Sequence, residues 1–312
     1  MGRPFVSVIV PVYNAEDCVV EALESVRNQT FRDFEAIVVD DVSTDCSAEV
    51  VGQFTSDHRF RLIRRETNGG AAAAQNTGIL AASGEWIALL GCDDLWMPEK
   101  LERQVALIRE SPDASLIFSN GIEFDESGDL RPFYRERRKL PEGHVLDRLL
   151  DRNCFWASSV MVRRTDLLEV GLFSEDLCVG EDYLVWALIL ARGGRAVGVW
   201  EPLVRYRKSV ASLSNRREQA YHDLERVHER LLDAGLDARR RRIVARALAR
   251  DRSDQHLCAA RLAIGSGRLR AASELLRAWL CLPGRVKPLL WIPLLLVPAG
   301  VEAVARNLAR KW

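Results

Sequence analysis

The chain has 312 residues, of which 28% are charged and 48% hydrophobic, a composition typical of a folded globular protein and not of a disordered one. That length accommodates one large α/β domain and a smaller appendage. The formal net charge is zero, but residues 236–312 hold 16 Lys and Arg against 5 Asp and Glu. The basic tail on an acidic body indicates an anionic partner, such as a membrane surface or nucleic acid, and a solvated Arg-rich helical face is the alternative.

The seven cysteines are scattered along the chain without a CxxC pair. This spacing indicates neither a disulfide framework nor a zinc site, and it favours a reducing compartment. We expect no secretory signal, because residues 1–5 lead straight into an apolar run without a charged leader or a cleavage site. The predicted location is therefore cytoplasmic.

The first 110 residues alternate between continuous apolar runs and segments with apolar residues at helical spacing. Strands are predicted at residues 6–11, 34–40, 61–64 and 85–90, and the first two are continuous apolar runs of the kind that is buried on both faces. Helices are predicted between and after them, at residues 16–28, 45–54, 71–82 and 99–110. The alternation predicts an α/β fold with a mostly parallel sheet, in which ligands bind outside the carboxyl ends of the strands.

The pattern is less regular after residue 111. Strands are predicted at residues 116–124 and 157–162, with pieces of strand over 196–207 that break at Pro202. A turn is predicted at residues 125–128 and an amphipathic helix at 183–191. From Glu218 onward the sequence is helical, with one possible hairpin over 259–280 that turns at 265–267.

Polar residues follow the first two strands at the edge where a ligand is expected. The first strand ends near Pro11 and Tyr13, and a tyrosine there either stacks on a nucleobase or packs the loop. The second ends in Asp40 and Asp41, and adjacent carboxylates are best tolerated where a ligand or cation offsets their repulsion. Because a carboxylate accepts hydrogen bonds from a base N–H or a ribose hydroxyl, we predict that Asp41 binds a ligand.

Two further acidic pairs carry possible chemistry. Asp93 and Asp94 follow an apolar strand, and Mg²⁺ or Mn²⁺ often binds through one or two carboxylates together with substrate phosphates. Such an ion neutralises charge that develops on a departing diphosphate. Glu181 and Asp182 open a predicted helix, where a carboxylate is stabilised as the anion and suits a base that accepts a proton from a hydroxyl. Helix capping alone is the alternative for this pair.

Taken together, six segments resemble, in order and spacing, the large glycosyltransferase family 2, whose catalytic domain has the GT-A fold. The resemblance runs from about Val6 to Ser214. It rests on SVIVPVYN, VVDDVSTD, NGGAAAAQNTG with ASGEWIALL, CDDLWMPEKL, GEDYLVWALILARGG and YRKSVASLS. It implies a GT-A domain over residues 1–215, with a Rossmann-like, mostly parallel sheet and helices on both faces, followed by a helical region over 216–312.

The resemblance also implies which residues bind a nucleoside-diphosphate sugar and a metal. Asp41 contacts the nucleobase in a pocket that Pro11 and Tyr13 line. Asp93 is the metal-binding residue of a DxD-type motif, for Mg²⁺ or Mn²⁺, and Asp94 is its acidic neighbour. The whole set implied in donor binding is Pro11, Tyr13, Asp40, Asp41, Gln75 and Asn76.

The implied reaction is transfer of a sugar from this donor to an acceptor hydroxyl. Asp182 corresponds to the base that deprotonates the acceptor in inverting members of the family, with Glu181 beside it. By the same resemblance, the expected setting is bacterial polysaccharide or other cell-surface glycan synthesis, with a glycan or lipid-linked acceptor.

The sequence departs from the family pattern at four positions. These are Gly91 at the first acid of the DxD-type motif, Val42 after the Asp pair, Gln75 in place of Arg, and Ser209 in place of His. We hypothesise that Arg207 or Lys208 contacts phosphate directly and replaces part of the metal's role.

Residues 289–301 are the most apolar stretch, flanked by basic residues. The stretch is shorter than the ~20 residues of a spanning helix and contains two prolines. With Trp291 and Trp312 as interface anchors, segment 288–305 is predicted to lie peripherally on the inner face of the cell membrane. Packing on the catalytic domain or a dimer contact is the alternative.

Two other functions compete with the transferase. The four departures motivate a catalytically impaired relative that binds sugar nucleotides or acts as a scaffold. A nucleotidyltransferase is disfavoured, because no Gly-rich, basic phosphate loop follows the first strand. No recognised motif supports nucleic-acid binding by the tail. The donor sugar, the acceptor and the linkage are not encoded in any pattern that we recognise.

Overall fold

The computed structural model describes residues 2–137, 140–208, 217–263 and 267–284, together with residues 288 and 292. The chain divides into two compact units, Met1–Ser212 and Leu213–Trp312. Ser209 and all of segment 288–305 except residues 288 and 292 lie outside the described residues. Within the described part, no helix is both long and apolar enough to cross a membrane.

A single mixed sheet forms the centre of the first unit. In the described residues its strand order is β3-β2-β1-β4-β8-β6-β9-β5, with β7 paired to β6. The strands are β1 (Val6–Val12), β2 (Phe34–Asp40), β3 (Phe60–Arg64), β4 (Trp86–Leu89), β5 (Leu95–Trp96), β6 (Leu116–Asp125), β7 (Gly128–Pro132), β8 (Met161–Arg163) and β9 (Ala196–Arg207). The β3-β2-β1-β4 half is parallel, whereas β8 is antiparallel to both of its neighbours.

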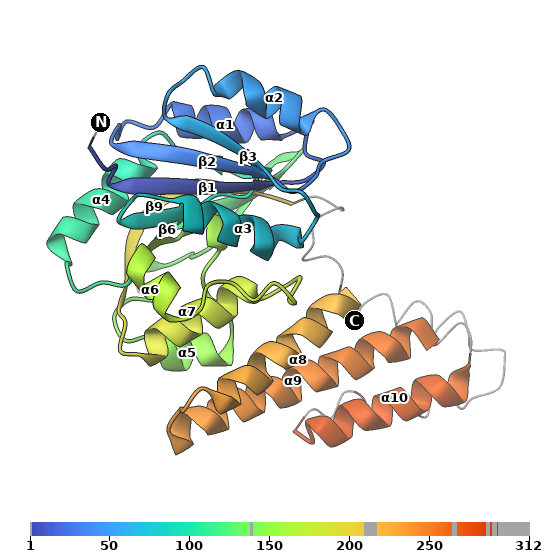
Figure 1. Ribbon diagram of the computed structural model, residues 1–312. Coiled ribbons are helices and arrows are strands. Elements are labelled where there is room, and N and C mark those ends of the chain that lie inside the picture. Colours follow the sequence, from blue (N-terminus) through green and yellow to red (C-terminus); the bar gives the residue numbers. More distant parts are fainter. Residues whose placement is uncertain are drawn as a thin grey trace. The chain divides into compact units, whose positions relative to one another are not determined.

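Helices cover both faces of the parallel half. Figure 1 shows α1 and α2 on one face and α3 on the other. In this unit the helices are α1 (Val19–Arg27), α2 (Ser47–Phe54), α3 (Gly70–Ala81), α4 (Lys100–Glu110), α5 (Leu146–Asp151), α6 (Arg164–Glu169) and α7 (Glu181–Ala191). Alternate residues of β1 point to opposite faces, so Val8 and Val10 share a core with α1, α2 and α4, whereas Ile9 faces Gly78 of α3. The predicted α/β class is confirmed.

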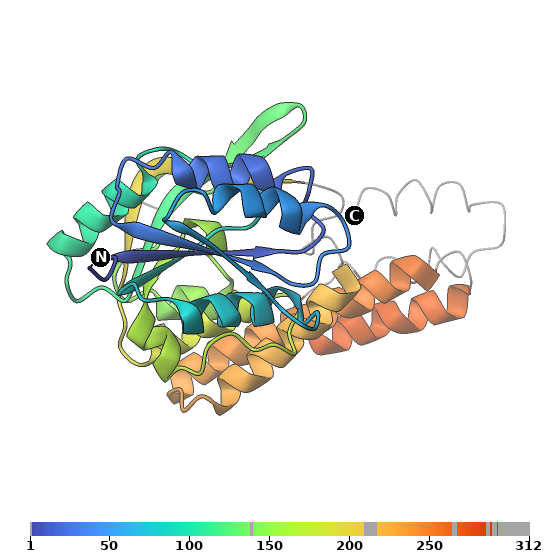
Figure 2. The ribbon, with the colours of Figure 1, turned by 45° about the horizontal axis from the view of Figure 1, so that its top comes forward.

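The second half of this unit differs from its prediction. Strand β9 continues through Pro202, because the register with β6 shifts on both sides of Asn120 and a bulge there tolerates a residue without an N–H. The strand predicted at residues 157–162 is instead a 3₁₀ turn, η2 (Ala157–Ser159), followed by β8. Strand β7 was not predicted; it forms a hairpin with β6 that projects from the unit in light green (Figure 2).

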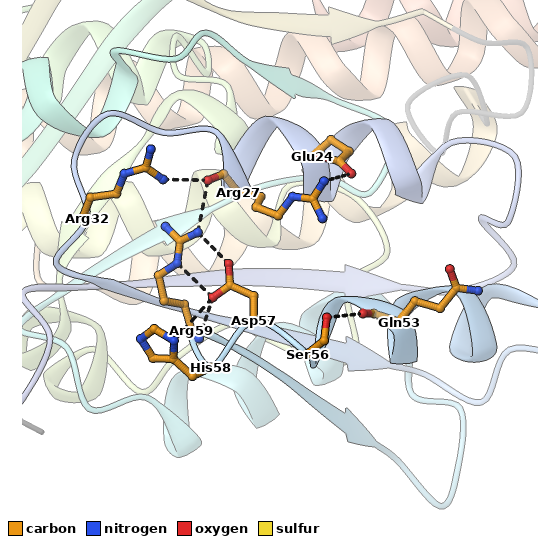
Figure 3. A network of polar contacts seen from close by, with 8 residues as sticks. All are labelled: Glu24, Arg27, Arg32, Gln53, Ser56, Asp57, His58 and Arg59. Atoms are coloured by element: carbon orange, nitrogen blue, oxygen red, sulfur yellow. Dashed lines mark hydrogen bonds and ion pairs between the residues drawn. The ribbon is translucent and has the colours of Figure 1, made fainter.

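A polar network connects the loops at the amino ends of the strands, at the opposite edge of the sheet from the expected ligand site (Figure 3). The Arg59 guanidinium contacts the Asp57 carboxylate at 2.6 Å, and donates to the carbonyl at the end of α1, Arg27 O, at 3.2 Å. Arg32 donates to the same carbonyl at 3.1 Å. This ion pair holds the pKa of Asp57 at about 2, below its ordinary value, because the charged carboxylate is hydrogen-bonded to Arg59.

The second unit is helical in its described part, as predicted. It contains α8 (Arg217–Asp233), α9 (Ala238–Ala263) and α10 (Arg268–Cys281). Helices α9 and α10 pack against each other through a small core of Ala260, Ala263, Ala271 and Leu275. The two arms of the hairpin predicted over residues 259–280 are therefore present, although the first arm belongs to a helix that begins at Ala238, and residues 264–266 of the predicted turn lie outside the described residues.

Candidate active site

Three loops meet at the carboxyl edge of the parallel strands, because β1 pairs in parallel with both β2 and β4. They comprise residues 12–15, 41–46 and 90–94. Direct hydrogen bonds join the first two loops: Asn14 Oδ1 accepts from the Thr44 N–H at 2.8 Å, and Ser43 Oγ accepts from the Asn14 N–H at 3.1 Å. This is the edge where an open α/β sheet binds its ligand.

The carboxylate of Asp41, predicted to contact a nucleobase, is held by the protein itself. Its side chain is nearly inaccessible, and Arg65 Nε lies 2.9 Å from Oδ1. The backbone N–H groups of Gly69 and Gly70 donate to it at 3.1 and 2.7 Å. These amides begin α3 and have no intrahelical acceptor, so Asp41 fixes the start of that helix.

Asp40, Tyr13 and Pro11 retain more freedom. Asp40 Oδ1 accepts from the Ser43 N–H at 3.2 Å, and among the described residues no donor reaches its other oxygen. Tyr13 is 51% exposed, so its ring is accessible for stacking. Pro11 lies half-buried near the end of β1.

Gln75 and Asn76 are both buried on α3 but differ in their contacts. Asn76 Nδ2 donates to Phe173 O and to Glu175 Oε1, each at 2.9 Å, and its Oδ1 accepts from the Phe173 N–H at 3.0 Å. It therefore joins α3 to the segment that leads into α7. The amide oxygen of Gln75 is buried without a hydrogen-bond donor in the described residues, which is costly unless a ligand supplies one.

The two aspartates after β4 have unequal surroundings. Asp94 is buried: its Oδ2 accepts from the Ser158 hydroxyl, and its Oδ1 accepts from the Arg207 N–H at 2.9 Å. Asp93 is only partly buried. Burial raises the pKa of both carboxyls, and the nearby Asp93 charge raises that of Asp94 further. A bound cation would offset the free-energy cost of keeping these two carboxylates charged.

The Arg207 side chain is already engaged. Its Nε donates to Asp93 O at 2.9 Å, and its Nη2 contacts Glu21 Oε2 at 2.6 Å. Its guanidinium also stacks on Phe124 at 4.6 Å. These contacts favour Lys208, whose Nζ lies 5.7 Å from the Tyr206 ring centre, as the cation that contacts phosphate in the hypothesis above.

Asp182 lies in the first turn of α7, where predicted. Gly180 precedes the helix with φ of 84°, a left-handed conformation that favours glycine. Asp182 Oδ1 accepts from the Tyr183 N–H at 2.6 Å, and the Asn153 side chain also hydrogen-bonds to it. Burial of the carboxyl nevertheless raises the pKa of Asp182 to about 6, although the residue as a whole is only partly buried. Glu181 is its partly exposed neighbour in the same turn.

The residues present fit a metal that the protein shares with a phosphate ligand. Within the described residues, no three His, Cys, Asp or Glu side chains converge to hold an ion. Mg²⁺ and Mn²⁺ do not require such a cage when substrate phosphates complete the coordination. Asp93 is the accessible carboxylate for this role, whereas Asp94 is occupied by Ser158 and Arg207.

Several residues of the site were not predicted. Arg65 pairs with Asp41, Asn153 bonds Asp182, and Ser158 bonds Asp94. They come from segments without a recognisable motif, and each reaches its partner only through the fold. The single sequence signal is indirect: a strand-end carboxylate that is buried needs a donor, but nothing in the sequence says which one.

The fold is that of the GT-A glycosyltransferases, which solved structures of that class share. The S. aureus protein TarS, residues 1–349, in complex with UDP-GlcNAc, superimposes with a TM-score of 0.65 at 20% identity, over 86% of this chain and 87% of that chain. The mannosyltransferase PcManGT from Pyrobaculum calidifontis, in complex with GDP-Man and Mn²⁺, gives 0.59 at 21% identity, over 100% and 88%.

The chain belongs to glycosyl transferase family 2, whose family model matches residues 7–171, and it is a glycosyltransferase. It is 30% identical over 234 residues to TuaG of Bacillus subtilis, a protein assigned to teichuronic acid biosynthesis, covering 72% of this chain and 90% of TuaG. It is 32% identical over 218 residues to the Escherichia coli UDP-Glc:α-D-GlcNAc-diphosphoundecaprenol β-1,3-glucosyltransferase WfgD, covering 70% and 82%. The predicted family is confirmed.

Proposed function

We propose that the enzyme transfers a sugar from a nucleoside-diphosphate donor to an acceptor hydroxyl with inversion at the anomeric carbon. The acceptor oxygen forms a bond to that carbon, the bond to the diphosphate oxygen breaks, and the nucleoside diphosphate leaves. The observation that carries the proposal is Asp182, a carboxylate in the first turn of α7 whose pKa is raised to about 6. A base with that pKa is ionised at neutral pH and still accepts a proton readily.

Asp182 takes the proton of the acceptor hydroxyl as the new bond forms. The N–H of Tyr183 and the side chain of Asn153 hold its carboxylate in a fixed orientation. Because these two bonds favour the charged form while burial disfavours it, the group is both oriented and basic. Glu181 lies beside it and is the weaker candidate for the same role.

The donor lies at the carboxyl edge of β1, β2 and β4. Tyr13 offers an exposed ring to the nucleobase, and Asp40 offers an oxygen without a donor among the described residues. Asp41 remains the predicted nucleobase ligand, although its contacts also support a purely architectural role. Asp93 would hold Mg²⁺ or Mn²⁺ against the diphosphate, and the ion would offset the charge of the leaving group.

The acceptor is a glycan or a lipid-linked saccharide in bacterial cell-surface glycan synthesis. The names of TuaG and WfgD support this class, since one is assigned to teichuronic acid and the other names a diphosphoundecaprenol acceptor. A lipid-linked acceptor would place the enzyme at the cytoplasmic face of the membrane. Segment 288–305 is the predicted peripheral contact, and binding to anionic vesicles at low salt, lost on removal of that segment, tests it.

Release of nucleoside diphosphate from a panel of sugar nucleotides tests the catalytic proposal. We expect release from one donor, dependent on Mn²⁺ or Mg²⁺. Asp182→Asn and Asp93→Ala should each reduce it by about 10²–10⁴-fold, and Glu181→Gln should reduce it less. Activity that survives Asp182→Asn would exclude this residue as the base.

The predicted alternative is an impaired relative that binds sugar nucleotides without turnover. The same panel separates the two, because binding raises the melting temperature even when no product forms. A donor that stabilises the protein but is never cleaved, with acceptors of both classes supplied, would favour that alternative.

A further inference from the structure

Lys100, the first residue of α4, is fully buried without a carboxylate partner in the described part of the chain. Its Nζ donates to Gln104 Oε1 at 2.7 Å and lies 3.9 Å from the centre of the Trp96 ring. Burial lowers the pKa of this amine well below its ordinary value. Burial of this amino group is costly, and it is offset only by the contacts with Gln104 and Trp96 in the described residues.

Both of those groups bind the same turn. Trp96 Nε1–H donates to Ser158 O at 2.8 Å, and Gln104 Nε2 donates to Ser159 O at 2.8 Å. Two successive carbonyls at the end of η2 are therefore fixed by side chains that Lys100 holds in place. The Lys100 amino group makes one hydrogen bond to the Gln104 amide and one contact with the face of the Trp96 indole, and these set the orientation of both side chains.

The η2 turn also fixes the loop that carries Asp93. The Ser158 hydroxyl accepts from the Gly91 N–H at 3.0 Å and donates to Asp94 Oδ2. It thus bridges the first and last residues of the loop 91–94, and Asp93 lies between them. The absence of a side chain at residue 91 leaves room for this arrangement, because a Cβ there would lie 3.1 Å from oxygens of both Asp93 and Asp94.

We propose that Lys100 and Ser158 are positioning residues for the Asp93 carboxylate, acting in series through Trp96, Gln104 and the η2 turn. The inference rests on the proposed function, in which Asp93 holds a divalent cation against the donor diphosphate. Lys100 and Ser158 touch neither the donor nor the cation in this arrangement. They fix the direction of the carboxylate, and residues of this kind typically contribute ~10–100-fold to metal affinity.

Direct binding of Mn²⁺ tests the proposal without relying on turnover. Free Mn²⁺ is measured by electron paramagnetic resonance during titration of the full chain with UDP present, and in parallel with GDP. Ser158→Ala and Lys100→Met should weaken Mn²⁺ binding by about tenfold or more. Nucleotide binding with EDTA present should be unchanged. Ser159→Ala is the matched control, since this neighbouring buried hydroxyl donates only to Trp156 O, at 2.7 Å, and should bind Mn²⁺ as the wild type does.

The outcomes separate this inference from the proposed function. If the wild type and Ser158→Ala bind Mn²⁺ equally well, the positioning role is wrong while the metal role of Asp93 stands. If the wild type binds no Mn²⁺ with either nucleotide, the metal role fails and the inference fails with it. If Lys100→Met does not fold, Trp96→Phe removes the Nε1–H donor and keeps an aromatic ring at this position, and normal Mn²⁺ binding by that variant would equally overturn the proposal.

Discussion

The ionisation of Asp182 gives the sharpest test of the catalytic arrangement. A base acts only when deprotonated, so the rate of transfer should rise with pH and reach half its maximum near pH 6, the value to which burial raises the pKa of Asp182. The hydrogen bond from Asn153 favours the charged form and so lowers this pKa. Asn153→Ala should therefore shift the midpoint upward.

The size of the shift follows from the strength of that bond. A hydrogen bond to a charged group contributes about 1.5–3 kcal/mol, and 1.36 kcal/mol corresponds to one pKa unit. We take the lower end of this range and expect a shift of about one unit. At pH 6 the variant should then be several-fold slower than the wild type, whereas at pH 8 the two rates should be nearly equal.

Initial rates of nucleoside diphosphate release, measured between pH 5 and pH 9 with saturating donor, give the profile. Asp182→Asn is the control, because it removes the ionisation and should abolish this limb of the profile. Asn153 also accepts from the Phe155 N–H at 3.1 Å, so the melting temperature of Asn153→Ala must be compared with that of the wild type. An unshifted midpoint, or an equal loss of rate at every pH, would refute the assignment of Asp182 as the base that Asn153 tunes.

Two further predictions concern stability. Gly78→Ala should destabilise the protein by about 1–3 kcal/mol in urea unfolding, because its Cβ would lie 2.6 Å from Ile9 Cγ2, whereas Gly52→Ala, which meets nothing within 4 Å, should be neutral or stabilising; equal effects would contradict this packing. Asp57→Asn should cost about 2 kcal/mol at most above pH 4, since the depressed pKa of Asp57 contributes stability that disappears as pH falls toward 2. Its difference from the wild type should vanish in acid, and a constant difference would argue against the ion pair with Arg59.

The parallel half of the fold was predictable because its signals are local. Strands β1, β2 and β4 are continuous apolar runs, α1 and α2 have an apolar periodicity, and α3 is a run rich in alanine, so local sequence places these elements to within a few residues. In the second half, β5 has two residues and β8 three, too short for any period to be visible. Strand β9 passes through Pro202 only because β6 shifts register beside it, a cross-strand property that a single segment does not contain.

The candidate site likewise has features that local sequence predicts and features that only the fold determines. Which carboxylates stand at the ligand edge was predictable, because each follows a strand or opens a helix. Their roles were not, since a role depends on which donors the fold brings to each oxygen. Asp40 and Asp41 are adjacent and chemically identical, yet Arg65 and the start of α3 occupy only Asp41. Asp93 and Asp94 differ in the same way, because Ser158 and the Arg207 N–H donate only to Asp94.

The contacts of Asp94 also bear on Gly91, one of the four departures from the family pattern. Gly91 leaves room for the Ser158 bridge, and a Cβ at residue 91 would lie 3.1 Å from oxygens of both Asp93 and Asp94. A buried serine therefore joins Gly91, the residue at the position of the missing acid, to Asp94, and Asp93 is left as the accessible carboxylate of the pair. The Ser158 and Arg207 hydrogen bonds offset part of the cost of burying the Asp94 carboxylate.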